Sequence, residues 1–190
     1  TERALKLTRS LSTYNRPGDA DSECDVVEII ESALRLVAKE LERSGTRIVK
    51  DFSTQPRLRM RAGQFQEVVL NLTLNAIQAT EDGEGVVRIS IQQSDQPGLF
   101  SIEISDNGQG IQDKDLERIF DPFFTTKGAL GGGSQSGTGL GLTVCYNIVH
   151  SHAGTLAVES QVGQGTTFRI TLPEAKERAT ESTRTTMATE

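Results

Sequence analysis

Residues 63–80 read GQFQEVVLNLTLNAIQAT, and no other stretch of the 190-residue chain says as much about the fold. Apolar residues occupy nearly every side of the helix that this stretch predicts, as in a helix buried on most of its surface. A single polar row interrupts them at offsets of four, four and three residues: Glu67, Asn71, Asn75 and Gln78. Because residues three and four apart share a helix face, these side chains form one line along a buried helix.

This polar row has two interpretations. Burying polar groups costs free energy unless each finds a partner, so the row is either a hydrogen-bond network, buried or open to solvent through a gap, or the wall of a ligand site. Amide oxygens are neutral, hard ligands that suit Mg²⁺, an ion that keeps several waters and bridges substrate phosphates. In the second interpretation the row faces a metal–phosphate ligand.

The flanking sequence predicts two further main helices and five strands, separated by Gly, Pro and polar turn residues. Asp25 and Glu28 form a capping-box pair at the start of the first helix. The predicted fold is α+β, a two-layer α/β sandwich with a sheet on one side and three main helices on the other. The helices are expected at 25–43, 63–80 and 140–151, a short helical turn at 113–119, and the strands at 46–52, 86–93, 99–105, 155–160 and 166–172.

The chain divides into three parts. Residues 2–15 carry a heptad-like apolar stripe that Pro17-Gly18 ends, so we expect residues 1–22 to be the end of a longer helix and a linker. Residues 23–173 are expected to form the domain, and the polar residues 174–190 a disordered tail. Without an initiator Met or a signal peptide, the chain is expected to be a piece of a longer protein.

Composition excludes several classes of protein. The formal net charge of −6 and the pI of about 5.1 argue against a nucleic-acid partner, which usually needs a basic surface. No apolar run approaches the roughly 18 residues that span a bilayer. The two cysteines have no disulfide-framework spacing, which fits a reducing compartment. With two histidines and neither an H-E-x-x-H motif nor a P-loop, a histidine-rich metal site and that phosphate loop are excluded.

A second candidate site element is Ser105-Asp106-Asn107-Gly108-Gln109-Gly110-Ile111, which follows an alternating strand. Asn-Gly after a strand often marks only a hairpin turn, but here the chain does not return as an alternating strand. Gly110 adds a second glycine two residues after Gly108. We therefore expect Asp106 to accept from an exocyclic amine, and the glycines to let a planar ring approach the backbone.

The third element is a glycine-rich loop, Gly137-Thr138-Gly139-Leu140-Gly141, which leads into the last predicted helix. Such a loop presents free backbone N–H groups and the positive end of the helix dipole, which together favour an anion. Between these two elements lies Phe120-Asp121-Pro122-Phe123-Phe124-Thr125-Thr126-Lys127, followed by a glycine-rich stretch. Adjacent aromatic residues before flexible chain are typical of a lid that is anchored at one end.

Taken in order over about residues 25–173, these elements resemble the nucleotide-binding domain shared by sensor histidine kinases, the heat-shock chaperone, type II topoisomerases and mismatch-repair ATPases. The lid and the Gly-Thr-Gly-Leu-Gly-Leu loop resemble bacterial two-component sensor histidine kinases in particular. This resemblance implies the Bergerat ATP-binding fold with a mixed sheet of roughly five strands. The matching boxes are Glu67-x-x-x-Asn71-x-x-x-Asn75, Asp106-x-Gly108-x-Gly110, Phe120 to Lys127, Gly137-x-Gly139-x-Gly141 and Gly163-x-Gly165-Thr166.

The resemblance also implies the cofactors ATP and Mg²⁺ and a role for each box. Asn75 would hold the metal, Asp106 would read the adenine amine, and Thr166 would support the adenine side. The loop 137–141 would cradle the phosphates. The implied catalytic residues are Glu67, Asn71 and Lys127. The implied nucleotide contacts are Asn71, Asn75, Gln78, Ala79, Asp106, Gly108, Gly110, Ile111, Phe124, Thr126, Lys127, Gly137, Thr138, Gly139, Leu140, Gly141 and Thr166.

The resemblance implies a kinase that transfers the ATP γ-phosphoryl group to a histidine outside this chain. Neither His150 nor His152 is followed by an acidic residue, as the acceptor of such kinases usually is, so both are expected to be structural. The expected partners are the protein's own dimerisation domain, in a homodimer, and a response regulator. A cytoplasmic location is expected, with membrane attachment of the whole protein left open. A nucleotide-gated interaction module and an anti-sigma-type serine kinase remain as alternatives.

Overall fold

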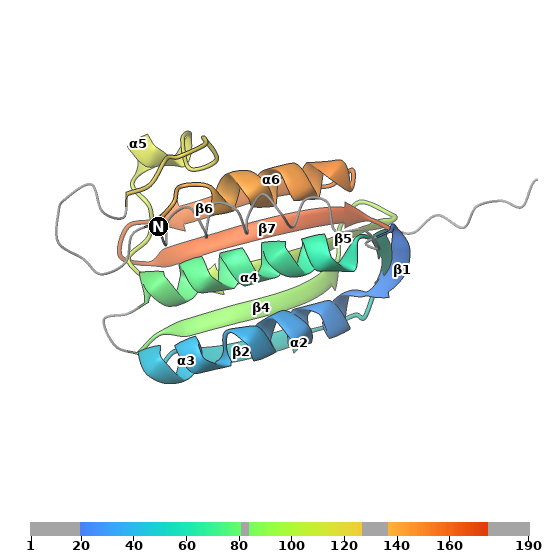
Figure 1. Ribbon diagram of the computed structural model, residues 1–190, viewed down its shortest axis with the longest axis horizontal. Coiled ribbons are helices and arrows are strands. Elements are labelled where there is room, and N and C mark those ends of the chain that lie inside the picture. Colours follow the sequence, from blue (N-terminus) through green and yellow to red (C-terminus); the bar gives the residue numbers. More distant parts are fainter. Residues whose placement is uncertain (1–19, 81–83, 127–136, 175–190) are drawn as a thin grey trace, which may run out of the picture.

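The computed structural model describes residues 20–80, 84–126 and 137–174. Its centre is a five-stranded sheet in the order β2-β4-β5-β7-β6, with helices packed on one face (Figure 1). Strands β2 and β4 are parallel and all the other neighbours are antiparallel, so the sheet is mixed. The strands are β2 (Arg47–Phe52), β4 (Val86–Gln93), β5 (Leu99–Asp106), β6 (Thr155–Gln161) and β7 (Gly165–Pro173).

Three main helices, α2, α4 and α6, lie side by side over the sheet, which confirms the predicted two-layer α+β architecture (Figure 1). The ends of α4 and α6 and of the five strands of this sheet lie within one residue of their predicted positions. The helices are α2 (Val26–Leu36), α3 (Ala38–Ser44), α4 (Ala62–Ala79), α5 (Asp113–Leu116) and α6 (Gly141–Ser151).

Helix α4 lies between α2 and α6 and buries its apolar sides against both helices and the sheet. The sheet contributes alternate residues of its central strands, such as Ile89, Ile102 and Ile170, all fully buried. Burying one such side chain is worth about 1.5–3 kcal/mol. The same alternation places Asp106 at the end of β5 on the face that carries the helices.

The single helix predicted at 25–43 is wrong in one respect, because the chain leaves helical geometry at Val37 and forms α2 and α3. Val37 is buried with φ −97° and ψ 4°, whereas its neighbour Leu36 is 64% exposed. A β-branched residue such as Val37 is a poor helix former. Here its side chain is buried while its backbone leaves helical geometry. The Asp25 half of the predicted capping box is confirmed, since Asp25 Oδ1 accepts from the N–H groups of Val27 and Glu28 at 2.9 and 3.3 Å.

A second, small sheet was not predicted. Strands β1 (Ser22–Asp25) and β3 (Arg57–Met60) pair antiparallel at the end of the molecule where α2 and α4 begin. Each strand has only four residues, too few for a clear alternation. The helix expected at 2–15 and nearly all of the predicted tail lie outside the described residues. Among the described helices, none is long and apolar enough to cross a membrane.

Candidate functional site

The polar row of α4 faces the start of α6. A Cβ at Gly141 would lie 3.7 Å from Asn71 Oδ1, which shows how closely that amide approaches the first residue of α6. One turn further along, the buried Cys145 lies beside both Asn71 and Glu67. Burial raises the pKa of the Cys145 thiol to about 12; the Asn71 hydrogen bond opposes this rise, and the charge of Glu67 adds to it.

Glu67 stands in the same half-buried environment. Partial removal from water raises the pKa of its carboxyl above the ordinary value. A carboxylate with a raised pKa is a better proton acceptor near neutral pH than an ordinary surface glutamate. The row therefore offers a candidate base at Glu67 and amide oxygens at Asn71 and Asn75, in line along one helix.

The loop after β5 holds Asp106 in a fixed orientation. Its Oδ1 accepts from the Gly108 N–H at 2.9 Å, so the carboxylate closes a short turn with its own loop. The Asn107 side chain faces β4, where its Oδ1 accepts from the Val86 N–H at 2.7 Å and its Nδ2 donates to the Glu84 carbonyl at 3.1 Å. These two hydrogen bonds were not predicted from the sequence, in which Asn107 is typical of a turn residue.

The same loop packs directly on the last turn of α4. The Gln109 N–H donates to the Ala79 carbonyl at 3.0 Å, which satisfies one of the carbonyls that a helix end leaves without a partner. A Cβ at Gly108 would lie 2.3 Å from that carbonyl oxygen, so only glycine fits. The end of α4, with Gln78 and Ala79, and the loop with Asp106 therefore form one structural unit.

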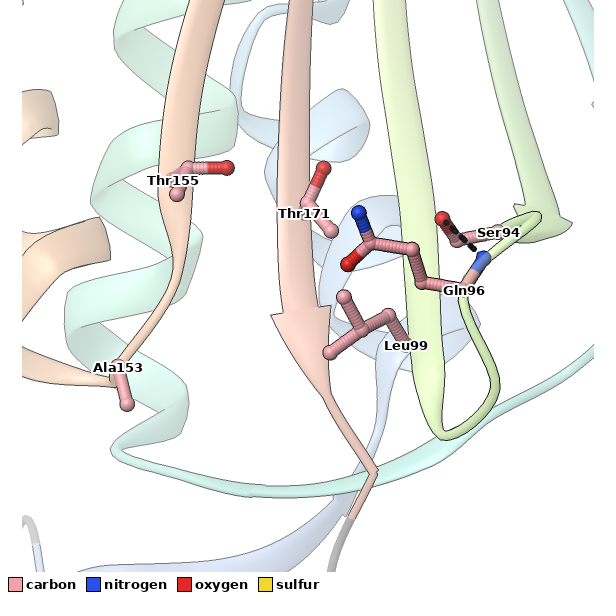
Figure 2. A pocket seen from close by; sticks show the side chains of 6 residues that line it. All are labelled: Ser94, Gln96, Leu99, Ala153, Thr155 and Thr171. Carbon is pink, nitrogen blue, oxygen red and sulfur yellow. Dashed lines mark hydrogen bonds between the residues drawn. The ribbon is translucent and has the colours of Figure 1, made fainter.

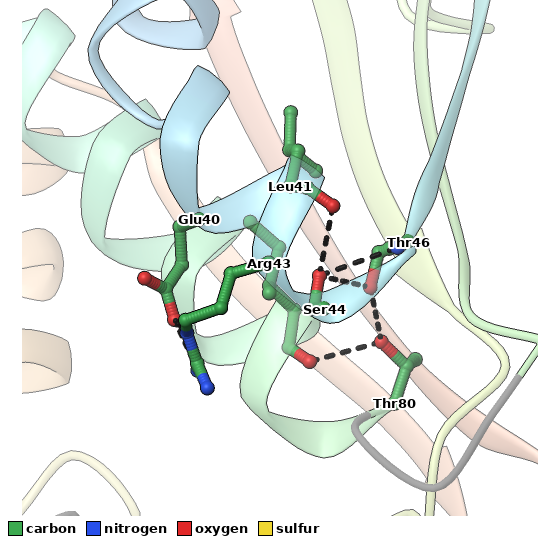
Figure 3. Close-up of polar contacts among 7 residues, drawn as sticks. Glu40, Leu41, Arg43, Ser44, Thr46 and Thr80 are labelled. Atoms are coloured by element: carbon green, nitrogen blue, oxygen red, sulfur yellow. Dashed lines mark hydrogen bonds and ion pairs between the residues drawn. The ribbon is translucent and has the colours of Figure 1, made fainter.

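A chain of hydroxyl groups fixes this end of α4 from the other side (Figure 3). The Thr80 Oγ1 lies 2.9 Å from the Ile77 carbonyl and 3.3 Å from the hydroxyl of Thr46, which precedes β2. Ser44 at the end of α3 continues the chain, with its Oγ 2.8 Å from Thr46 Oγ1. The last turn of α4 is thus held between β2 and the Asp106 loop.

The far end of the loop is joined to the β6–β7 hairpin. Gly110 has φ +72°, and a Cβ there would lie 2.2 Å from the Gln161 carbonyl oxygen. The next residue, Ile111, donates its N–H to Ser160 Oγ at 2.8 Å. Thr166 is buried and is the register partner of Asp106 across β5 and β7, so the two predicted base contacts are neighbours.

The glycine-rich loop meets the aromatic segment at the start of α6. Gly139 has φ +68°, and its carbonyl accepts from the Phe123 N–H at 2.9 Å. Thr143, in the first turn of α6, donates its hydroxyl to the Phe120 carbonyl at 2.9 Å. These contacts hold the backbone of the loop at the helix end, whose first N–H groups have no partner within the helix.

The predicted site residues therefore gather at two ends of one elongated region. Asp106, Gly108, Ala79 and Thr166 lie at one end, and Asn71 with Gly141 at the other, eight residues or roughly 12 Å away along α4. Phe124 is half-buried, with the Arg118 guanidinium over its ring, 4.7 Å from the ring centroid. Thr126, Gly137 and Thr138 are exposed at the margins, and Lys127 lies outside the described residues.

Both histidines lie at the opposite end of α6, about 15 Å from its start. His152 Nε2 accepts from the Arg61 N–H at 3.0 Å, so its Nδ1 carries the proton and donates to the Ile148 carbonyl at 2.8 Å. The ring thereby joins the end of α6 to the start of α4. His150 is exposed and packs against Tyr146, with ring centroids 4.2 Å apart and the ring planes tilted by 46°.

A separate hollow of about 240 Å³ lies at the distal end of the sheet. It is lined by the β4–β5 hairpin and the strand ends beside it, with residues Ser94, Gln96, Leu99, Ala153, Thr155 and Thr171 (Figure 2). Leu99 and Asp106 are the two ends of β5, roughly 23 Å apart. None of the predicted site residues lines this hollow.

Comparison with known proteins shows the family of the chain. Residues 60–176 match the family described as histidine kinase-, DNA gyrase B-, and HSP90-like ATPase. The chain belongs to this ATPase family, and it is therefore an ATP-binding domain.

Within the family, the chain is a catalytic domain of the sensor histidine kinase kind. It is 38% identical to the sensor histidine kinase ZraS of Escherichia coli K12 over 150 residues, which cover 78% of this chain and 30% of that protein. It is 34% identical to sporulation kinase E of Bacillus subtilis 168 over 152 residues, which cover 80% of this chain and 19% of that protein. The chain thus spans less than a third of each of these relatives.

The solved structures lead to the same group. The catalytic domain of histidine kinase ThkA superposes with a TM-score of 0.69 at 26% identity, over 82% of this chain and 98% of that chain. The mycobacterial sensor histidine kinase MprB superposes with a TM-score of 0.70 at 26% identity, over 83% of this chain and all 100% of that chain.

Proposed function

We propose that this domain transfers the γ-phosphoryl group of Mg·ATP to a histidine of an adjoining dimerisation domain, as the catalytic half of a two-component sensor kinase. The observation that carries the proposal is the arrangement along α4. An acceptor pair, Asp106 and Thr166, stands at one end, and a glycine-rich helix start stands beside Asn71 at the other. An adenine base at the first end would extend its phosphates toward the second.

The chemistry of the residues fits Mg²⁺. Among the described residues, no three His, Cys, Asp or Glu side chains form a group that could hold a metal ion. A cation here would therefore depend on amide oxygens, water and the phosphates themselves, which is the usual setting of Mg²⁺ at a nucleotide. Asn75 would hold the ion and Asn71 its hydration shell. When bound, the ion would neutralise charge on the phosphates.

Each remaining group would act by position or by proton transfer. Asp106 would accept from the base amine, while Gln78, Ala79, Gly108, Gly110 and Ile111 would enclose the base. The amides of 137–141 would bind the phosphates at the start of α6. Glu67, half-buried with a raised pKa, would accept a proton from the attacking histidine. Lys127, Phe124 and Thr126 would close over the nucleotide from the lid.

The rest of the protein follows from this role. We propose that residues 1–22 continue a dimerisation helix, that the domain covers residues 23–173, and that residues 174–190 are a tail. The whole protein would be a homodimer whose phosphorylated histidine passes its phosphoryl group to a response regulator. This transfer would take place in the cytoplasm.

Labelling with γ-³²P-ATP tests this function. An acceptor nitrogen must come within roughly 3–3.5 Å of the phosphorus, and both histidines lie at the far end of α6. The chain alone should therefore stay unlabelled. Adding the histidine-bearing fragment of the same protein should give acid-labile, alkali-stable label on that fragment. Label on the 190-residue chain itself, or none on the fragment despite ATP binding, would contradict the proposal.

A further inference from the structure

Ser160 lies under the loop that carries Asp106, at an inward position of β6, and its hydroxyl has three partners. The Oγ is 2.8 Å from the Ile111 nitrogen, 3.0 Å from the Gly165 carbonyl oxygen and 2.9 Å from Thr166 Oγ1. No motif identified in the sequence includes Ser160.

Only one arrangement of protons satisfies all three partners at once. A serine hydroxyl has one proton to donate and two lone pairs to accept with. Because a carbonyl can only accept, Ser160 donates to Gly165, and because an amide N–H can only donate, Ser160 accepts from Ile111. All three bonds can therefore be made at once only when the bond to Thr166 uses the proton of Thr166. This leaves Thr166 Oγ1 with lone pairs only for any other partner.

Thr166 is the neighbour of Asp106, where the base is proposed to bind. Whether the Thr166 hydroxyl donates or accepts a hydrogen bond therefore matters for a bound base. The side chain of Thr166 is 5% exposed and is held in register with Asp106 across β5 and β7. Asp106 as a carboxylate also only accepts. The base end of the site therefore presents two acceptors side by side. The amine at C6 of a 6-amino purine has two hydrogens, one for each acceptor. The carbonyl oxygen at C6 of a 6-oxo purine sets acceptor against acceptor, and the N1–H beside it can satisfy only one of the two.

We infer that Ser160 is a positioning residue that makes the site prefer 6-amino purines over 6-oxo purines, by holding the Thr166 hydroxyl as an acceptor. The inference rests on the proposed function, since it assumes that the purine lies against Asp106. Without Ser160 the Thr166 hydroxyl is free to rotate and to donate to a 6-oxo group.

Calorimetric titration with ADP and with IDP, its 6-oxo counterpart, tests this inference. We define the ratio as the dissociation constant for IDP divided by that for ADP. Ser160→Ala should lower this ratio about three- to tenfold, the effect of one ordinary hydrogen bond. Ser160→Thr keeps the hydroxyl and suits a strand, so it should keep the wild-type ratio. A purely structural serine would change both affinities together and leave the ratio unchanged.

Two controls isolate the pathway through Thr166. Ser105 Oγ bonds to Thr167 Oγ1 between the same two strands, but on the opposite face of the sheet, so Ser105→Ala should leave the ratio unchanged. In a Thr166→Ala background, adding Ser160→Ala should not change the ratio further, because the hydroxyl that it orients is gone. If Ser160→Ala does not fold, Ser160→Cys decides, since a thiol is only a weak donor and acceptor.

The outcomes separate the two claims. If the wild-type chain binds neither nucleotide, the proposed function fails. If it binds ADP, and folded Ser160→Ala or Ser160→Cys keeps the wild-type ratio, the proposed function stands and the role of Ser160 is overturned.

Discussion

Glu67→Gln should slow phosphoryl transfer to the acceptor fragment by about 10²–10⁴-fold, the usual loss when a general base is removed. Glutamine keeps the shape of the side chain and its place beside Cys145 but cannot accept the proton. Because Glu67 is not expected to contact the base, the dissociation constant for ADP should stay within about threefold of wild type. Single-turnover labelling and calorimetry measure the two quantities separately.

The same substitution should change stability in a defined direction. The folded state holds the proton of Glu67 to a higher pH than the unfolded state, because partial burial raises the pKa. Wild-type stability therefore falls as the pH rises from the ordinary glutamate pKa to the raised one, and the penalty is complete above the raised pKa. Glu67→Gln should remove this penalty. The variant should be more stable than wild type at pH 7 in urea unfolding, with the difference shrinking as the pH falls toward 4.5 and absent below it.

Glu40→Gln is the matched control for both measurements. Glu40 lies on α3, where a hydrogen bond from Arg43 lowers the pKa of its exposed carboxyl (Figure 3). Loss of the Glu40 carboxylate should not affect the rate of phosphoryl transfer to the acceptor fragment. Transfer by Glu67→Gln within about threefold of wild type would remove Glu67 from the chemistry.

Asp106→Asn should weaken ADP binding about 10- to 100-fold and leave the fold intact. The asparagine oxygen can still accept from the Gly108 N–H, as Asp106 Oδ1 does at 2.9 Å. The NH₂ group of the asparagine then stands where Asp106 has its second carboxylate oxygen. It is a donor facing the amine of the base, which is also a donor. A hydrogen bond to a charged group is worth about 1.5–3 kcal/mol, and each 1.4 kcal/mol is about tenfold in affinity.

Asp95→Asn, an exposed change in the distal β4–β5 hairpin, is the control and should bind ADP as wild type does. Calorimetry of both variants, with thermal unfolding to verify the fold, checks the prediction. A folded Asp106→Asn protein with wild-type affinity would show that the base does not lie against this carboxylate.

Much of the architecture could be predicted from the sequence, because the long elements have clear periods. Strand β4 and helix α4 each repeat their apolar residues over two or more turns or pleats, and their ends lie within one residue of prediction. The break at Val37 could not be predicted in this way. The apolar spacing runs through Val37 unchanged, so only the backbone reveals it.

The parts of the site that depend on residue type could be predicted. The parts that depend on which distant residues share a hydrogen bond could not. The polar row of α4 and the glycines beside Asp106 are visible as patterns. Ser160 and Asn107 act through hydrogen bonds to residues 49 and 21 positions away in sequence, and no local period marks such pairs. A polar residue at an inward position of β6, close to Thr166, was the one available signal for Ser160.

The most direct test of the central claim is a crystal structure of this domain with Mg²⁺ and a non-hydrolysable ATP analogue. We predict the base amine on the Asp106 carboxylate beside Thr166, and the phosphates against the amides of residues 137–141 with the metal on Asn75. A folded domain that holds the analogue elsewhere, for example in the hollow lined by Ser94 and Thr171, would contradict the account.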